Sequence, residues 1–134
     1  MYVLHQYLLK DFDMIFFTGD LPPHDMWRQT VAGNLAIMDE AMDIMKDYFI
    51  KMDVFNLIGN HEPHPLNVFS FPELGDDVPV NTDYIYEAAW SHWRYWFPVE
   101  HQENVLNGGR YSISPKLGLR IIGINNLYGY FYNW

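Results

Sequence analysis

The sequence predicts an α/β fold for this chain of 134 residues. Two short apolar runs, at 14–18 and 54–58, have the length and the β-favouring content of buried strands. Between them, apolar side chains recur at steps of three and four from residue 26 to residue 50, which is typical of a long amphipathic helix. A strand, a helix and a strand in this order predict two parallel, adjacent strands joined by a right-handed crossover.

The remaining elements of the N-terminal half are read from the same periodicities. Residues 2–10 carry apolar side chains at helical spacing, which predicts a helix or the end of one. After the first strand, Pro22 and Pro23 impose an extended loop, because each proline restricts its own backbone and that of the preceding residue. The stripe of the 26–50 helix is rich in methionine, which predicts packing against the sheet. Trp27 is expected to be a packing anchor rather than a substrate contact.

The C-terminal half predicts a loop, a helix and a hairpin. Prolines and a glycine spread over 63–80 indicate an irregular loop, and aromatic side chains at helical spacing indicate a helix over 84–97. Alternating side chains predict an antiparallel pair of strands at 110–114 and 119–125. The histidines of this half that lack metal-ligand spacing are expected at ordinary surface or helix positions: His92 and His101.

The composition excludes several classes of function. The formal charge of −9, with only eight basic residues, argues against a nucleic-acid partner, because a phosphate backbone requires clustered Lys and Arg. The absence of cysteine excludes disulfides and thiolate metal sites. Residues 1–10 lack the basic and apolar regions of a signal peptide, and no apolar stretch approaches the ~20 residues of a membrane span. The sequence ends on an aromatic run at 128–134, whereas protein termini are usually polar, so we expect a truncated sequence here.

Metal-capable side chains follow both strands of the predicted parallel pair. Gly19 and Asp20 come directly after the first strand, and Gly59, Asn60 and His61 come after the second. Because the carboxyl ends of parallel strands meet at one sheet edge, we expect these side chains to lie together. Asp20 is either a ligand that bridges divalent cations or a turn cap, and Asn60 is either an amide-oxygen ligand or a turn residue. The pairing of the two strand ends favours the metal interpretation.

Several neighbouring side chains have the chemistry of proton transfer. His61 can orient or protonate a phosphate oxygen, since imidazole exchanges protons near neutral pH. His24, held by two prolines after Asp20, is either an acid for a departing alkoxide or a surface-loop histidine. Glu62 either orients a neighbouring imidazole or caps the following loop, and His64 is a candidate for the mouth of a pocket.

Three motifs together resemble one family. They are Thr18-Gly19-Asp20, His24-Asp25-Met26-Trp27 and Gly59-Asn60-His61-Glu62-Pro63. Together they resemble the calcineurin-like metallophosphoesterases, and within them the acid sphingomyelinase branch. The segments 65–72, 108–115 and 118–122 also look like sequence that follows in this branch, so that the resemblance covers the chain from about residue 12 to its end.

The resemblance implies phosphodiester hydrolysis of the sphingomyelin phosphodiesterase kind, which converts sphingomyelin to ceramide and phosphocholine. Asp20 would bridge two zinc ions, and Asn60 would ligate one of them. His24 and His61 would be catalytic and face the phosphodiester, one assisting the leaving group and one stabilising developing charge, with His64 as a further substrate-binding candidate. The partner would be a phospholipid or another phosphodiester, and a membrane surface could be engaged through that substrate.

Two parts of the family pattern have no counterpart in this sequence. The opening Asp-x-His motif is absent before Asp20, and the downstream histidine ligands are absent after Asn60. We therefore expect 1–134 to be a fragment of one catalytic domain, a metallophosphoesterase core without its first strand and C-terminal part, and inactive in isolation. The resemblance implies a secreted or lysosomal protein, although this chain carries no signal peptide. The alternative is a non-catalytic remnant that acts as a binding or interaction module.

Overall fold

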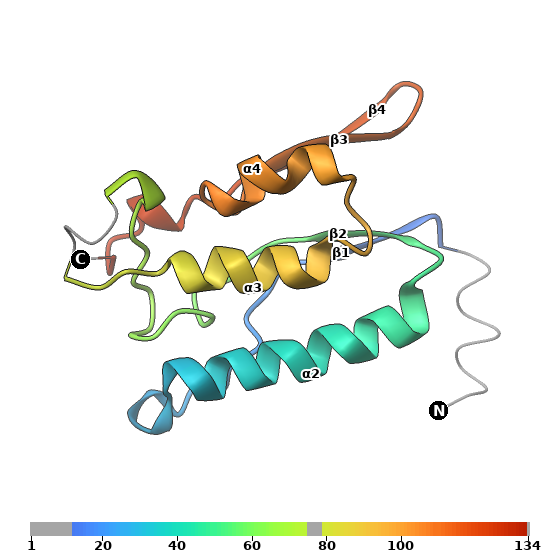
Figure 1. Ribbon diagram of the computed structural model, residues 1–134. Coiled ribbons are helices and arrows are strands. Elements are labelled where there is room, and N and C mark those ends of the chain that lie inside the picture. The colour runs from blue at the N-terminus through green and yellow to red at the C-terminus, as the bar shows by residue number, and fades with distance from the viewer. Residues whose placement is uncertain (1–11, 75–78, 134) are drawn as a thin grey trace.

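A computed structural model describes residues 12–74 and 79–133. These residues form a mixture of helices and strands, which confirms the predicted α/β class (Figure 1). The helix predicted over residues 2–10 lies outside the described residues.

The two apolar runs form a parallel pair of strands, as predicted. Strand β1 (Met14–Phe17) lies beside β2 (Asp53–Asn56) with Met14 opposite Asp53 and Phe17 opposite Asn56. The backbone N–H of Leu57 donates to the carbonyl of Phe17 over 2.7 Å, so the contact continues past the last paired residues. Both strands therefore end at the same edge of the sheet.

Helix α2 (Val31–Phe49) connects the two strands and begins later than predicted. The side chain of Thr30 caps it by accepting from the backbone N–H of Gly33 over 3.0 Å. Before the cap, extended backbone at Gln29 separates α2 from a short 3₁₀ turn, η2 (Met26–Arg28). The expected packing role of Trp27 is wrong, because its side chain is 80% exposed on this turn.

Helix α3 (Asp83–Trp93) is shorter than the predicted 84–97 segment. Pro98 disfavours helical backbone at Phe97, and the chain continues into a 3₁₀ turn, η4 (Val99–His101), and a short helix, α4 (Gln102–Leu106). Neither of these elements was predicted. Helix α3 packs against both α2 and α4, and Figure 1 shows it running between them.

Strands β3 (Tyr111–Lys116) and β4 (Leu119–Gly123) form the predicted antiparallel pair. The register is irregular between Ile113 and Lys116, where Pro115 lacks a backbone N–H to donate. The hairpin projects beyond α4 in Figure 1 and contributes Tyr111 and Ile113 to the main core. That core is built on α3, and its members are Phe55, Ile58, Phe69, Ile85, Tyr86, Ala89, Trp93, Phe97, Val105, Tyr111 and Ile113.

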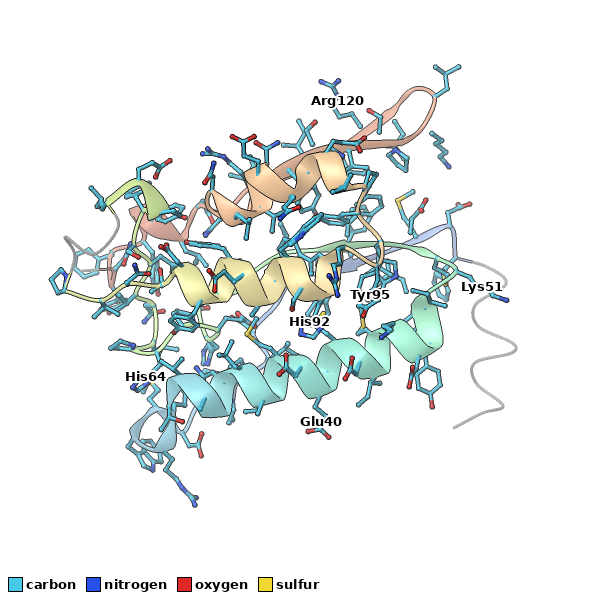
Figure 2. The ribbon with its side chains drawn as sticks, in the orientation of Figure 1. Glu40, Lys51, His64, His92, Tyr95 and Arg120 are labelled. Atoms are coloured by element: carbon cyan, nitrogen blue, oxygen red, sulfur yellow. The ribbon has the colours of Figure 1, made fainter. Side chains whose placement is uncertain are left out.

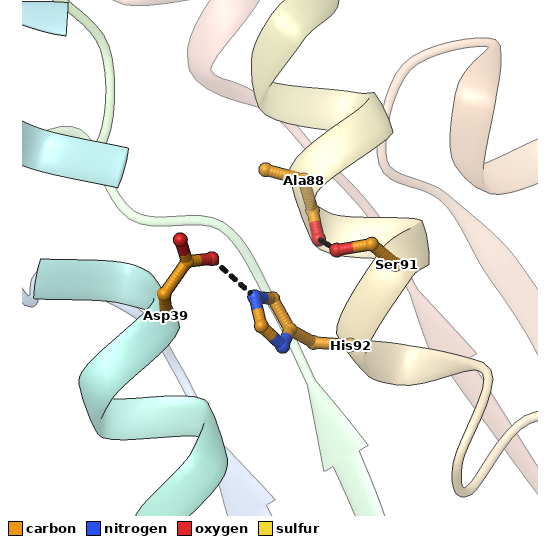
Figure 3. Close-up of polar contacts among 4 residues, drawn as sticks. All are labelled: Asp39, Ala88, Ser91 and His92. Atoms are coloured by element: carbon orange, nitrogen blue, oxygen red, sulfur yellow. Dashed lines mark hydrogen bonds and ion pairs between the residues drawn. The ribbon is translucent and has the colours of Figure 1, made fainter. Parts of the chain in front are cut away.

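A polar contact joins the two long helices. His92 on α3 lies 2.7 Å from a carboxylate oxygen of Asp39 on α2 (Figure 3), with side-chain exposures of 12% and 61%. The structure places His92 on a helix, one of the two kinds of position expected for it, but its contact with Asp39 was not predicted. Because Asp39 is well solvated, we expect this pair to contribute at most about 1 kcal/mol to stability. Within the described residues, no helix combines the length and the apolar character needed to cross a membrane.

Candidate functional site

The turns after β1 and β2 touch each other through their glycines. Gly19 has a φ of 77°, in the left-handed region that favours glycine. A Cβ placed on Gly19 would lie 2.3 Å from the backbone nitrogen of Gly59, which is closer than atoms approach without a shift. The two glycines therefore permit a backbone contact between turns that are far apart in the sequence.

This contact brings Asp20 to the second turn. Its Oδ1 accepts a hydrogen bond from the backbone N–H of His61 over 3.2 Å. A Cβ on Gly59 would lie 2.2 Å from the same Oδ1, so glycine is required beside the carboxylate. Asp20 has a φ of 67°, a region that Asp and Asn tolerate better than most residues.

Glu62 makes the reciprocal connection between the turns. Its Oε1 accepts from the backbone N–H of Leu21 over 2.9 Å, while its side chain is buried. The structure shows Glu62 holding the turn that carries Asp20, which is neither of the two roles expected for it. Burial raises the pKa of the Glu62 carboxyl, and the negative charge of Asp20 adds to the rise, whereas the hydrogen bond from Leu21 opposes it.

The two candidate catalytic histidines lie side by side. The ring centroids of His24 and His61 are 4.3 Å apart, and the ring planes meet at 68°. His24 is exposed on the loop after the prolines, while His61 is buried. The Nδ1 of His61 is buried and has no hydrogen-bond partner among the residues that the structure describes. The site therefore places one accessible and one enclosed imidazole in edge-to-face contact beside Asp20.

Asn60 and His64 lie on either side of His61 and Glu62 in the chain, and both are half-buried. The Nδ2 of Asn60 donates to Oδ1 of Asn67 over 2.9 Å, and both residues are half-buried. His64 donates its backbone N–H to the Tyr84 hydroxyl over 2.9 Å. Its side chain lies near the N-terminal end of α2 in Figure 2. His64 also lines a surface hollow, whose lining residues are Met26, His64, Pro65, Leu66, Asn67 and Tyr132.

Asn34 was not singled out from the sequence, yet it holds this turn. It is 1% exposed on α2, and its Nδ2 lies within 3.4, 3.1 and 3.3 Å of the carbonyl oxygens of His61, Glu62 and Pro63. A sequence signal existed, because Asn34 precedes Met38 and Met42 at steps of four on the buried stripe of the helix. A polar residue on a buried stripe indicates an internal hydrogen-bond partner.

We predict that Asn34→Ala lowers the free energy of unfolding by about 1–3 kcal/mol, because it leaves buried carbonyls unpaired. The measurement is urea unfolding followed by circular dichroism. Glu40→Ala on the same helix is the matched control, since Glu40 is exposed and points away from the sheet in Figure 2. The control is expected to change stability by less than about 0.5 kcal/mol. Equal losses in both variants would show that Asn34 matters only as a helix residue.

The donor set of the two turns fits a hard or borderline divalent cation in part. Asp20 offers a carboxylate, which lies in the space that a Cβ on Gly59 would occupy. Asn60 offers the oxygen of an amide whose nitrogen donates to Asn67. No group of three or more His, Cys, Asp or Glu side chains among the described residues is arranged to hold a metal ion. Asp20 and Asn60 therefore have the chemistry of metal ligands, but the described residues do not form a complete coordination shell.

No family model matches the chain, but curated proteins from several organisms are similar to it. It is 35% identical over 114 residues to the sphingomyelin phosphodiesterase of Homo sapiens, a match that covers 85% of this chain and 18% of that protein. It is 37% identical over 118 residues to sphingomyelin phosphodiesterase B of Dictyostelium discoideum, covering 87% of this chain and 17% of the relative. A cyclic GMP-AMP phosphodiesterase of Homo sapiens is 29% identical over 141 residues, covering 92% and 28%.

These matches relate the chain to phosphodiesterases over most of its own length. The chain spans about a fifth of the length of the sphingomyelin phosphodiesterases that it matches, since the shares are 18% and 17%.

Proposed function

We propose that this chain is part of the catalytic domain of a metal-dependent phosphodiesterase in the sphingomyelinase-like branch of the calcineurin-like metallophosphoesterases. The observation that carries the proposal is the contact between the two strand-end turns, where the His61 backbone donates to Asp20 over 3.2 Å. It gathers a carboxylate, an amide and two imidazoles at one sheet edge. The similarity to proteins named sphingomyelin phosphodiesterase supports the same conclusion from the sequence.

Asp20 and Asn60 would hold zinc in this proposal, with further ligands supplied by parts of the protein outside this chain. Two bound zinc ions would supply neutralisation of the charge on the phosphodiester. His24, which is exposed, would give a proton to the departing alkoxide oxygen. His61 lies against it and would donate to a non-bridging phosphate oxygen, while His64 would contact the substrate at the neighbouring hollow.

We propose sphingomyelin or a related phospholipid as the substrate, giving ceramide and phosphocholine in the case of sphingomyelin. A cyclic dinucleotide is the second candidate, because the chain is also similar to a cyclic GMP-AMP phosphodiesterase. The chain's net charge of −9 favours the zwitterionic lipid, since a dinucleotide carries two negative phosphodiesters. Delivery to the lysosome or the outside of the cell is part of the same proposal.

The alternative is a binding module without catalysis. It is favoured by one finding, the lack of a three-residue His, Cys, Asp or Glu metal cluster in the described part of the chain. The contact of Asp20 with the His61 turn favours catalysis. A binding surface does not require a carboxylate fixed against the backbone of a second turn, whereas a metal ligand does.

The test is to purify the full-length protein that contains this segment, measure its zinc content, and assay phosphocholine release from sphingomyelin in detergent micelles. Cyclic GMP-AMP is assayed in parallel under the same conditions. Zinc-dependent phosphocholine release supports the proposal, and hydrolysis of the dinucleotide alone supports the second substrate. A zinc-free protein that hydrolyses neither compound would favour the binding module.

A further inference from the structure

We propose that Asn67 is a positioning residue that orients the side-chain amide of Asn60 toward a cation. The Nδ2 of Asn60 donates to Oδ1 of Asn67 over 2.9 Å. A primary amide has its donors and its acceptor on opposite sides of the group, so an acceptor that holds the nitrogen leaves the oxygen available elsewhere. The inference rests on the proposed function, because there the Asn60 oxygen serves as a metal ligand.

The backbone of Asn67 is arranged for this contact. Its N–H donates to the carbonyl of Asn60 over 3.0 Å, so the two residues are joined by a backbone bond as well as a side-chain bond. Asn67 has a φ of 68°, in the left-handed region where asparagine and glycine are favoured over other residues. The loop therefore closes on itself between positions 60 and 67, and the residue that closes it carries the acceptor.

Asn67 also lines the hollow that contains His64 and Tyr132. A substrate group seated in the hollow would touch the residue that fixes the Asn60 amide. Partners that orient a metal ligand in this way typically change metal affinity or activity by about 10- to 100-fold when they are removed.

The same loop has a second fastening that does not involve Asn60. The backbone N–H of Phe69 donates to Oδ1 of Asn133 over 2.9 Å, and Nδ2 of Asn133 donates to the carbonyl of Phe69 over 3.1 Å. Asn133→Ala would therefore loosen the loop and leave the Asn60–Asn67 pair intact. It provides the matched control for a structural role of Asn67.

The first experiment follows the side-chain amide protons of Asn60 by NMR in the ¹⁵N-labelled chain. Asn67→Gly removes the acceptor and suits the positive φ, and Asn67→Asp keeps an acceptor of the same size but cannot donate. We expect one Asn60 amide proton to exchange about fivefold more slowly than in Asn67→Gly, the factor expected for a typical hydrogen bond. That slowing should persist in Asn67→Asp and in Asn133→Ala.

Two results would overturn the proposal. If the protected protons belong to Asn67 and protection is lost in Asn67→Asp, the pair runs in the opposite direction and the Asn60 oxygen is engaged. If Asn60 exchanges equally fast in the unmodified chain and in Asn67→Gly, the hydrogen bond does not orient it. Neither result depends on metal binding or turnover.

The second experiment measures zinc affinity and phosphodiester hydrolysis in the full-length protein, with bis(4-nitrophenyl) phosphate as a small soluble substrate. We expect Asn67→Gly to weaken zinc affinity about 10- to 100-fold, Asn67→Asp to stay near the unmodified protein, and Asn133→Ala to have no comparable effect. Equal zinc affinity in Asn67→Gly, or an equal loss in Asn133→Ala, would overturn the positioning role. An unmodified protein without zinc or activity would instead remove the proposed function, and with it Asn67's role toward a cation.

Discussion

Replacement of Gly59 by alanine is expected to lower the free energy of unfolding by about 3 kcal/mol or more. The new Cβ would lie 2.2 Å from Oδ1 of Asp20 and 2.5 Å from the backbone nitrogen of Asp20. The backbone nitrogen cannot move aside as a flexible side chain can, so the two turns would have to separate. Separation would also break the hydrogen bond from the His61 backbone to Asp20. Urea unfolding of the chain is the measurement.

Gly129→Ala is the matched control for this substitution. Gly129 lies in the 3₁₀ turn η5 (Leu127–Gly129), and a Cβ there would meet no atom within 4 Å. We expect its stability to change by less than about 0.5 kcal/mol. A Gly59→Ala chain as stable as the control would show that the two turns do not touch as described.

The second large effect is on catalysis. In the full-length protein, Asp20→Asn is expected to reduce zinc-dependent phosphodiesterase activity by about 10³-fold or more, since it removes the charge of the carboxylate that is proposed to bridge the two zinc ions. Asparagine retains an oxygen that can accept from the His61 backbone, and it tolerates the φ of 67° at this position. Stability is therefore expected to stay within about 1 kcal/mol of the unmodified protein. The measurements are turnover, zinc content and thermal unfolding.

Asp43→Asn removes the same charge at an exposed position on α2 and serves as the control. We expect its turnover and zinc content to equal those of the unmodified protein. Full activity and unchanged zinc in Asp20→Asn would remove Asp20 from the site. Loss of activity with loss of folding would show instead that the carboxylate serves the turn.

Sequence periodicity was sufficient for the parts of the fold that depend on short-range patterns. The parallel strands, the C-terminal hairpin and the long helix between the strands all follow from spacing of apolar side chains. The start of α2 was misplaced because η2 carries the same kind of apolar side chains as the helix, and only the extended backbone at Gln29 separates them. The helix α4 was missed because it is a single short element after Pro98, with only Val105 buried.

The sequence predicts the part of the candidate site that depends on which residues follow the two strands. Asp20 and His61 were expected to meet because each follows a strand of a parallel pair, and the structure brings them into contact. The supporting contacts of Asn34 and Asn67 could not be predicted in the same way. They depend on which backbone atoms come within reach after folding, and a helical or loop asparagine carries no sign of its partner beyond its position on a buried stripe.

The joining of the two turns has a thermodynamic consequence. Asp20 and His61 are 41 positions apart in the sequence, so the contact between their turns exists only in the folded chain. A ligand that bridges the turns binds the native state and not the unfolded one, and at a hundredfold excess over its dissociation constant it adds about 2.7 kcal/mol to stability. The melting temperature of the chain therefore reports how much of this ligand is bound, without an assay of turnover.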